Sequence, residues 1–400
     1  MHVALYSPAW PLIRYPNGVV TYVHWMREAL TALGHSVTVF AGAMDPDWNE
    51  PGVHRVAGTP LTRCKRWVRN RVPAWRNPLV DWAEELAHSI SRVHVTQPFD
   101  VIEIEESFGL FGELARVMKI PVIVKLHGPA FLSLIEEELG TPAADQKIAA
   151  EGRALKQAQA VISPSRDVLD RTVALYALHP PICEHVVNPL TLPKTTPVWD
   201  LASCDRKTIL FVGRFDKRKG GDLVLLAFER LLHTRPDLQL VFIGPDFGVD
   251  GGDGVLLKFE EFRRRVFGDR PTPQIRFLGR QSGAEIAVQR VHAMLTLVAS
   301  RWENQSYTAL EAMLQGCPVI STDCGGQSEI VRHGSTGLLA RPDDVDDLCN
   351  KIACVLDAPD MAAELGRRAR AYVLDQHSPE VVARQTLAVY QRAIAAAAAR

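Results

Sequence analysis

Short apolar runs alternate with stretches of helical periodicity along most of the chain. Residues 2–6 and 36–40 have the pattern of strands, and between them apolar side chains recur at helical spacing over 19–33. The alternation returns later, with strands expected at 207–212 and 238–243 on either side of another helical stretch. Parallel neighbouring strands need a long crossover connection, which is usually a helix. The pattern therefore predicts an α/β protein with parallel sheets.

The length of the chain and a proline-rich interruption together predict two domains. Four hundred residues are more than one ordinary hydrophobic core contains. Residues 189–206 carry three prolines and little periodicity, as a linker does. We expect a first domain at 1–188, a second at 207–378, and a closing amphipathic helix at 379–400 that fades into alanines.

Composition and charge exclude several classes of protein. With 47% hydrophobic and 23% charged residues, the chain has an ordinary soluble globular composition. Its 45 Lys and Arg balance 46 Asp and Glu, so the overall charge favours no polyanionic partner. The seven scattered cysteines form no Cys-x-x-Cys pair, which predicts buried thiols in a reducing compartment. No stretch approaches the ~18 apolar residues of a membrane span, and the first strand leaves no room for a signal peptide. We expect a cytoplasmic protein.

The segment 55–76 breaks this even distribution of charge. No acid occurs in it, and Trp67 and Trp75 lie among its cations. These cations are Arg55, Arg63, Lys65, Arg66, Arg69, Arg71 and Arg76. The pattern is compatible with peripheral contact to an anionic membrane or a phosphate-bearing acceptor, and equally with a solvated excursion. Nothing else in the chain has the pattern of a nucleic-acid module, so no nucleic-acid partner is expected.

A polar corner joins a strand to a helix in the stretch 299–330. The apolar run 294–299 ends at a corner containing Glu303, and a helical pattern follows until Gly316. In a parallel sheet, ligands bind beyond the carboxyl ends of the strands, and the free amides at a helix start suit phosphate. Glu303 in the corner and Glu311 in the helix can therefore face one ligand without forming a close like-charge pair.

The residues of this stretch resemble a family signature. Glu303, seven residues and Glu311, followed by Ala-Met, a Gly and Pro-Val, are similar to the signature of retaining glycosyltransferases of family 4. The Gly-Gly-x-x-Glu loop that ends at Glu329 and the run that starts at His333-Gly-Ser-Thr-Gly fit the same family. The family often has Pro-Ser before the corner, where this chain has Ala299-Ser.

The resemblance covers nearly the whole chain and is most specific over 207–342. It implies the GT-B fold, in which two Rossmann-like domains face each other across a cleft. The second domain would hold a nucleotide sugar and the first domain the acceptor. The helix at 379–400 is expected to cross back to the first domain.

Several loops at strand ends receive roles from the resemblance. In the Gly-Arg…Lys-Gly loop after the strand 207–212, Arg214 and Lys219 would clamp the donor pyrophosphate, for which a planar guanidinium and a compact ammonium are suited. Lys217 and Arg218 are interpreted as surface charge. His127, at the end of the strand 121–126, would lie near the donor sugar.

Further ligand contacts complete the implied site. Glu303 would bind hydroxyls of the donor sugar, and Glu311 those of the ribose. The loop from Arg280 would pass the nucleotide base, and Gly18 is either a glycine opposite the donor phosphates or a simple turn. The implied catalytic set is Glu303, His127, Arg214 and Lys219. The implied substrate-binding set is Gly18, Arg214, Lys219, Arg280, Glu303, Asn304, Ser306, Tyr307, Thr308 and Glu311.

The acidic residues outside this site are also considered as possible ligand or metal contacts. Asp45 and Asp47 flank a proline in a loop, while Asp344 and Asp346 open a helix, where acids suit the helix dipole. We therefore expect no metal and no cofactor. The polar run that starts at Glu105, Glu-Glu-Ser, follows a strand and could bind acceptor hydroxyls or merely solvate a loop.

The implied reaction is metal-independent transfer of a sugar, with retention, from a nucleoside diphosphate sugar to an acceptor hydroxyl. Uridine is favoured over guanosine as the base. The acceptor could be a small molecule or a lipid-linked or polysaccharide precursor. The alternatives are a nucleotide-sugar epimerase on the same fold and a non-catalytic nucleotide-sugar-binding protein.

Overall fold

The computed structural model describes residues 1–400 apart from 59–66, 68–77, 135–138, 253 and 400. The described chain divides into two compact units, Met1–Pro189 with Ser378–Arg400, and Leu190–His377. Only 55–58 and Trp67 of the basic segment 55–76 belong to the described residues. The predicted membrane contact of that segment therefore lies outside them.

Unit 1 is built on a seven-stranded parallel sheet with the strand order β3-β2-β1-β4-β5-β6-β7. The strands are β1 (His2–Trp10), β2 (Ser36–Met44), β3 (Val53–Arg55), β4 (Val101–Glu105), β5 (Val122–Lys125), β6 (Ala160–Ser163) and β7 (Ile182–His185). The helices among the described residues are α1 (Gly18–Ala32), α3 (Pro78–Thr96), α4 (Phe111–Val117), α5 (Ala130–Ser133), α6 (Pro142–Leu155), α7 (Arg166–Tyr176) and α15 (Pro379–Ala398), with the 3₁₀ turn η2 (Ser107–Gly109).

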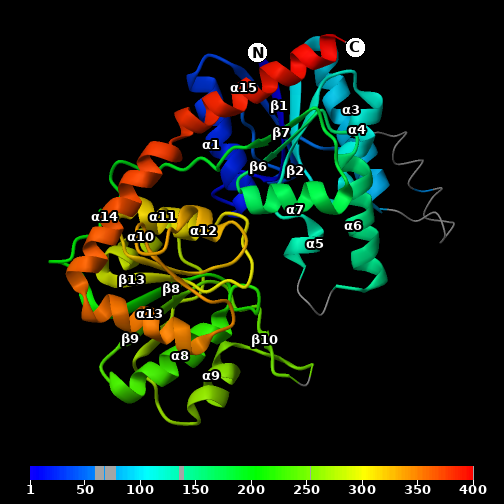
Figure 1. The fold of residues 1–400 in the computed structure, drawn as a ribbon. Helices are drawn as coiled ribbons and strands as arrows, with labels where there is room; N and C mark the ends of the chain where they lie inside the picture. Colours follow the sequence, from blue (N-terminus) through cyan, green and yellow to red (C-terminus); the bar gives the residue numbers. More distant parts are fainter. Residues whose placement is uncertain (59–66, 68–77, 135–138, 253, 400) are drawn as a thin grey trace. The chain divides into compact units, whose positions relative to one another are not determined.

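Alternate side chains of these strands enter different layers. Val3, Leu5, Val39 and Ala41 share one core with residues of α1 and α15. Figure 1 shows α15 beside α1, and α3, α4 and α6 on the opposite side of the sheet. The closing helix thus packs with the amino-terminal part of the chain, as the resemblance implied.

Unit 2 is built on a six-stranded parallel sheet with the order β12-β9-β8-β13-β14-β15. The strands are β8 (Asp205–Val212), β9 (Gln239–Ile243), β12 (Ile275–Phe277), β13 (Ala293–Val298), β14 (Val319–Thr322) and β15 (Leu338–Ala340). The helices are α8 (Gly221–Thr234), α9 (Phe259–Phe267), α10 (Gly283–His292), α11 (Tyr307–Gln315), α12 (Gln327–Ile330), α13 (Val345–Asp357) and α14 (Pro359–Gln376). In Figure 1, α10, α11 and α12 lie on one side of this sheet and α8, α9 and α13 on the other. Both units confirm the predicted α/β class.

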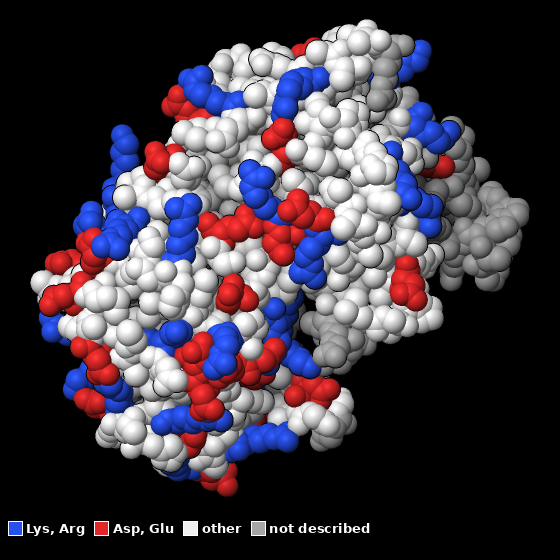
Figure 2. All heavy atoms as spheres, viewed as in Figure 1, with Lys and Arg blue, Asp and Glu red and all other residues white. Residues whose placement is uncertain are grey.

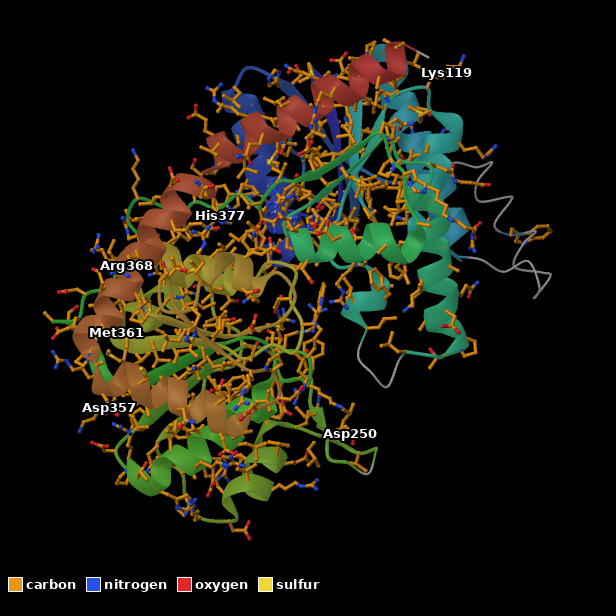
Figure 3. All side chains as sticks on the ribbon, viewed as in Figure 1. Lys119, Asp250, Asp357, Met361, Arg368 and His377 are labelled. Carbon is orange, nitrogen blue, oxygen red and sulfur yellow. The ribbon has the colours of Figure 1, made fainter. Side chains whose placement is uncertain are left out.

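One segment differs from expectation. The stretch 189–206, expected as a linker, lies almost wholly in unit 2, because Trp199 is buried there and its indole donates to the carbonyl of Ala293 at 2.7 Å. Helix α6 begins at Pro142, because Thr141 caps it there. The connection after β9 contains a short antiparallel hairpin, β10 (Val249–Asp250) with β11 (Leu256–Leu257), marked by Asp250 in Figure 3.

The distribution of charge on the surface and the length of the helices bear on possible partners. On the face drawn in Figure 2, acidic and basic side chains lie interspersed. Among the helices that the structure describes, none is both long and apolar enough to cross a bilayer.

Candidate active site

The strand order of unit 2 brings two predicted loops together. Successive connections run in one direction from β8 to β12 and in the other from β13 to β15, so the sheet has its topological switch point between β8 and β13. Ligands of open α/β sheets bind beyond the carboxyl ends of the strands at such a point. The loop 213–220 follows β8, and the corner 299–306 follows β13.

At this switch point, Lys219 contacts Glu303. The Lys219 Nζ atom donates to Glu303 Oε1, and Ser300 Oγ donates to the same oxygen at 2.7 Å. The glutamate side chain is buried and the lysine is mostly buried. An ammonium that can bind phosphate and a carboxylate that can bind hydroxyls therefore lie side by side.

Two glycines allow the loops to approach this closely. Gly220 has φ +71°, and a Cβ atom there would lie 1.9 Å from the carbonyl oxygen of Ala299. Gly325 has φ +53°, and a Cβ atom there would lie 2.1 Å from the carbonyl oxygen of Glu303, which accepts a bond from the amide of Gly326 at 3.0 Å. Only glycine combines this backbone conformation with so little space.

The surroundings of Glu303 keep its carboxylate ionised. Burial by itself would raise the pKa of Glu303, but the charges of Lys219 and Arg218, with the hydrogen bonds from Lys219 and Ser300, lower it below its usual value. Arg218, interpreted as surface charge, thus lies close enough to Glu303 to lower its pKa. Its guanidinium is partly buried and lies 5.9 Å from the centre of the Trp302 ring.

Arg214 lies on the same loop as Lys219 but is held differently. Its Nε lies 2.7 Å from an Asp216 carboxylate oxygen without the alignment of a hydrogen bond, and its guanidinium lies 5.2 Å from the centre of the Phe247 ring. The other Asp216 oxygen accepts the amide of Lys219 at 2.7 Å. Asp216 therefore fixes the loop, and the partly exposed guanidinium of Arg214 is available to a ligand.

Glu311 has a cationic partner of its own. Arg290, which is fully buried, donates from Nη2 to Glu311 at 3.1 Å and from Nη1 to Gln315 at 2.5 Å. About a third of the Glu311 side chain (32%) remains exposed. The hydroxyl of Tyr307 is buried without a hydrogen-bond partner among the described residues, and burial together with the charge of Glu311 raises its pKa well above the usual value.

One of the backbone amides at the start of α11 already has a hydrogen-bond acceptor within the protein. Ser306 belongs to the implied substrate-binding set, but its amide donates to the side-chain oxygen of the buried Gln327 at 3.1 Å. Ser306 Oγ accepts the amide of Ala309, which caps the helix. The amides of Tyr307 and Thr308 have no acceptor among the described residues, so these two remain for a ligand.

The other predicted ligand contacts of unit 2 lie around this corner. Asn304 is buried in the corner itself. Arg280 is exposed after β12, on a loop that a bond from the Gly244 amide to the Gly279 carbonyl (2.8 Å) attaches to the end of β9. Within the described part of the chain, no hydrogen bond or ion pair joins Arg280 to Glu303, and its contact with the base stays a prediction.

In unit 1, His127 stands at the end of β5. The amides of His127 and Gly128 donate to the buried carboxylate of Glu106 at 2.9 and 2.5 Å. Burial and the charge of Lys125 lower the pKa of His127 to about 3, so the imidazole is neutral. Gly18 begins α1, directly after the capping residue of that helix.

The polar run at the end of β4 belongs to a buried carboxylate cluster. Glu105, Glu106 and Glu151 are all buried, so the interpretation of this run as loop solvation is wrong. Ser107 Oγ donates to Glu105 at 3.0 Å, and Glu151 accepts the amide of Ala130 at 2.8 Å. Burial, followed by the charge of Glu106, raises the pKa of Glu105 and of Glu151 to about 8.

Unit 1 should lose stability as the pH rises from about 4.5 to about 8. In that window the unfolded chain has ionised Glu105 while the folded chain still holds the proton. Glu105→Gln should remove the part of this loss that comes from Glu105 while Glu151 keeps its own part, so the variant should be more stable than the wild type at pH 8 by about 1 to 3 kcal/mol and nearly equal at pH 4. Calorimetric melting at both pH values measures the difference, with the exposed Glu28→Gln as the matched control. Equal pH dependence of variant and wild type would contradict the assignment.

The Asp-x-Asp pairs have structural partners. Asp344 caps α13 by accepting the amide of Asp347 at 2.8 Å, and Asp346 pairs with Arg230. Asp45 accepts the amide of Asp47 at 3.2 Å. In the described part of the molecule, no group of three or more His, Cys, Asp or Glu is arranged to hold a metal.

Comparison with known proteins places both units in one family. Residues 17–189 match the family described as glycosyl transferase 4-like domain. Residues 200–372 match the family described as glycosyl transferases group 1. The chain is 24% identical to glycogen synthase of Mycobacterium tuberculosis and 26% identical to D-inositol 3-phosphate glycosyltransferase of Kribbella flavida, each over 94% of this chain and 91% of the relative.

Solved structures agree on the fold. Sucrose-phosphate synthase from Thermosynechococcus elongatus matches with a TM-score of 0.76 at 24% identity, covering 99% of both chains. Anabaena Alr3699/HepE in complex with UDP-glucose matches with a TM-score of 0.70 at 16% identity, covering 98% of this chain and all of that one. With family matches in both units and two Rossmann-like parallel-sheet domains, the chain belongs to the GT-B glycosyltransferases of family 4.

Proposed function

We propose that this glycosyltransferase is a retaining, metal-independent enzyme that takes its sugar from a nucleoside diphosphate sugar. The observation that carries the proposal is the contact of Lys219 with the ionised Glu303 at the switch point of unit 2. A diphosphate needs cations, and a sugar needs acceptors for its hydroxyl groups. Both kinds of group meet where ligands of such sheets bind.

The residues divide the work according to their charge. Negative charge develops on the leaving diphosphate, where Lys219, Arg214 and the amides of Tyr307 and Thr308 would stabilise it. Because Lys219 and Ser300 already hold Glu303, we propose that this carboxylate binds sugar hydroxyls rather than attacking the anomeric carbon. The acceptor would then arrive on the face from which the diphosphate leaves, which retains the configuration.

The base and the acceptor are proposed from the relatives. The Anabaena structure contains UDP-glucose, so we favour UDP over GDP. The relatives named for glycogen and for inositol phosphate act on hydroxyl-bearing compounds, and we propose an acceptor hydroxyl of a sugar or of a lipid-linked or polysaccharide precursor. The role of His127 beside the donor sugar stays a prediction. Its neutral imidazole can donate from one ring nitrogen and accept at the other.

Product analysis tests the reaction. The protein should release UDP from UDP-glucose or a related donor only when an acceptor is present, and NMR of the product should show the anomeric configuration of the donor. Conversion of the donor alone into an epimer would favour the epimerase. Tight binding of nucleotide sugars without turnover over a broad acceptor panel would favour the non-catalytic alternative.

Transfer activity should survive an excess of EDTA. The cations of the 213–220 loop would supply the positive charge that a divalent ion supplies in metal-dependent enzymes, and both Asp-x-Asp pairs already have structural partners. Initial rates with EDTA, with Mg²⁺ and with Mn²⁺ should agree within error. Loss of turnover in EDTA and recovery on adding Mn²⁺ would contradict the metal-independent mechanism.

A further inference from the structure

Arg301 occupies the corner between β13 and Glu303 and connects it to the neighbouring loop. Its side chain is only 20% exposed. The guanidinium forms two parallel bonds with Asp222, at 2.9 and 2.7 Å, and donates from Nε to Asp343 at 2.6 Å. It also donates to the carbonyl oxygen of Lys217. These are four bonds to protein acceptors from one side chain.

The backbone of the corner adds a further link. The amide of Arg301 donates to the carbonyl oxygen of Arg218 at 2.8 Å. Arg301 is thus bonded to two consecutive peptides directly before Lys219, while Glu303 follows it by two residues. Asp222 stands in the first turn of α8, directly after the same loop. The contacts with Lys217, Arg218 and Asp222 join the segment carrying Lys219 to the segment carrying Glu303.

The geometry requires an arginine rather than just a positive charge. A guanidinium is planar, and its donors point in fixed directions, so it can bind a carboxylate with two bonds and still reach a carbonyl group and a second carboxylate. A lysine ammonium is a compact charge with three donors and cannot span these four acceptors. The arrangement is therefore sensitive to Arg301→Lys as well as to a neutral replacement.

We propose that Arg301 is a positioning residue that sets the distance between Lys219 and Glu303, and hence between the diphosphate and the sugar of a bound donor. The part of this proposal that concerns the donor rests on the proposed function. Arg301 acts through the loop, because its donors are directed to Asp222, Asp343 and Lys217. A merely structural ion pair would contribute to stability without affecting Lys219 in particular.

Chemical labelling of lysines tests the positioning without any substrate. In the whole protein, acetylation of Lys219 by a limiting reagent should be slow, because its ammonium is mostly buried against Glu303. In Arg301→Gln the loop is released, and Lys219 should react several times faster while Lys351 in α13 reacts as before. Arg341→Gln is the matched control, since that arginine pairs with Asp344 and not with the loop.

Labelling of Lys219 at the wild-type rate in Arg301→Gln would overturn the proposal. Should that variant fail to fold, as shown by faster labelling of Lys351 as well, Arg301→Lys decides. It retains a cation beside Asp222 but not the fork, and Lys219 should again react faster. A wild-type rate at Lys219 in a folded Arg301→Lys protein would equally overturn the proposal.

Steady-state kinetics provide a second test of the role of Arg301. Misplacement of reacting groups by about 1 Å costs about a hundredfold in rate, so Arg301→Gln should lower kcat/KM by about that factor. In a Lys219→Ala background the same change should cost much less, because the residue that Arg301 positions is already absent. Equal losses in both backgrounds would overturn the proposal. Absence of any transfer by the wild type would refute the proposed function, and the labelling result would still decide the role of Arg301.

Discussion

Glu303→Gln should lower kcat about tenfold to a hundredfold and leave the affinity for the free nucleoside diphosphate within about threefold of wild type. Hydrogen bonds to a charged group contribute about 1.5 to 3 kcal/mol, and glutamine replaces them with weaker neutral ones. The free diphosphate has no sugar for Glu303 to hold, so its binding should depend on Lys219 and Arg214 instead. Steady-state rates and calorimetry with UDP measure the two quantities.

A glutamate outside the site provides the control for Glu303→Gln. Glu364→Gln, on the exposed side of α14, makes the same chemical change away from the site and should leave both quantities unchanged. If Glu303→Gln instead lost UDP binding at full kcat, its role would be to hold Lys219 in place for the diphosphate. If both quantities were unchanged, the corner would have no role in the donor site.

The meeting of Lys219 with Glu303 could be predicted in part from the sequence. Each follows an apolar run with strand character, and parallel strands place their carboxyl ends at one edge of a sheet. The sequence does not show that β8 and β13 are neighbours, because pairs such as Leu210 with Thr296 join strands that are distant in the chain. Strand order depends on packing over the whole unit.

The partners of Arg290 and Arg301 could not be predicted. Arg290 and Arg301 appear in the sequence as ordinary charges on a helix and in a corner, and their acceptors come from other elements. A possible signal for Arg290 was its place among apolar residues of a short helix, in the sequence Ile-Ala-Val-Gln-Arg-Val. The packing of 189–206 in unit 2 could not be predicted for the same reason, because the hydrogen-bond partners of Trp199 lie far along the chain.

Glu311→Gln should weaken the binding of UDP about tenfold to a hundredfold and change kcat little. A contact to ribose is the same in the ground state and the transition state, so its loss raises KM and Kd without slowing the chemical step. Gln is preferable to Ala because it leaves an acceptor for Arg290, whose buried guanidinium would otherwise keep only Gln315. Truncating one partner of a buried pair is strongly destabilising in itself.

Inorganic pyrophosphate separates the ribose contact from an indirect effect of Glu311. It offers the charges of the donor without the sugar of the nucleoside, so wild type and Glu311→Gln should bind it equally. If the variant lost pyrophosphate binding as strongly as UDP binding, the change would act through Arg290 and the fold of α11 rather than through ribose. If it bound UDP like the wild type, the exposed third of Glu311 would make no contact with the nucleotide.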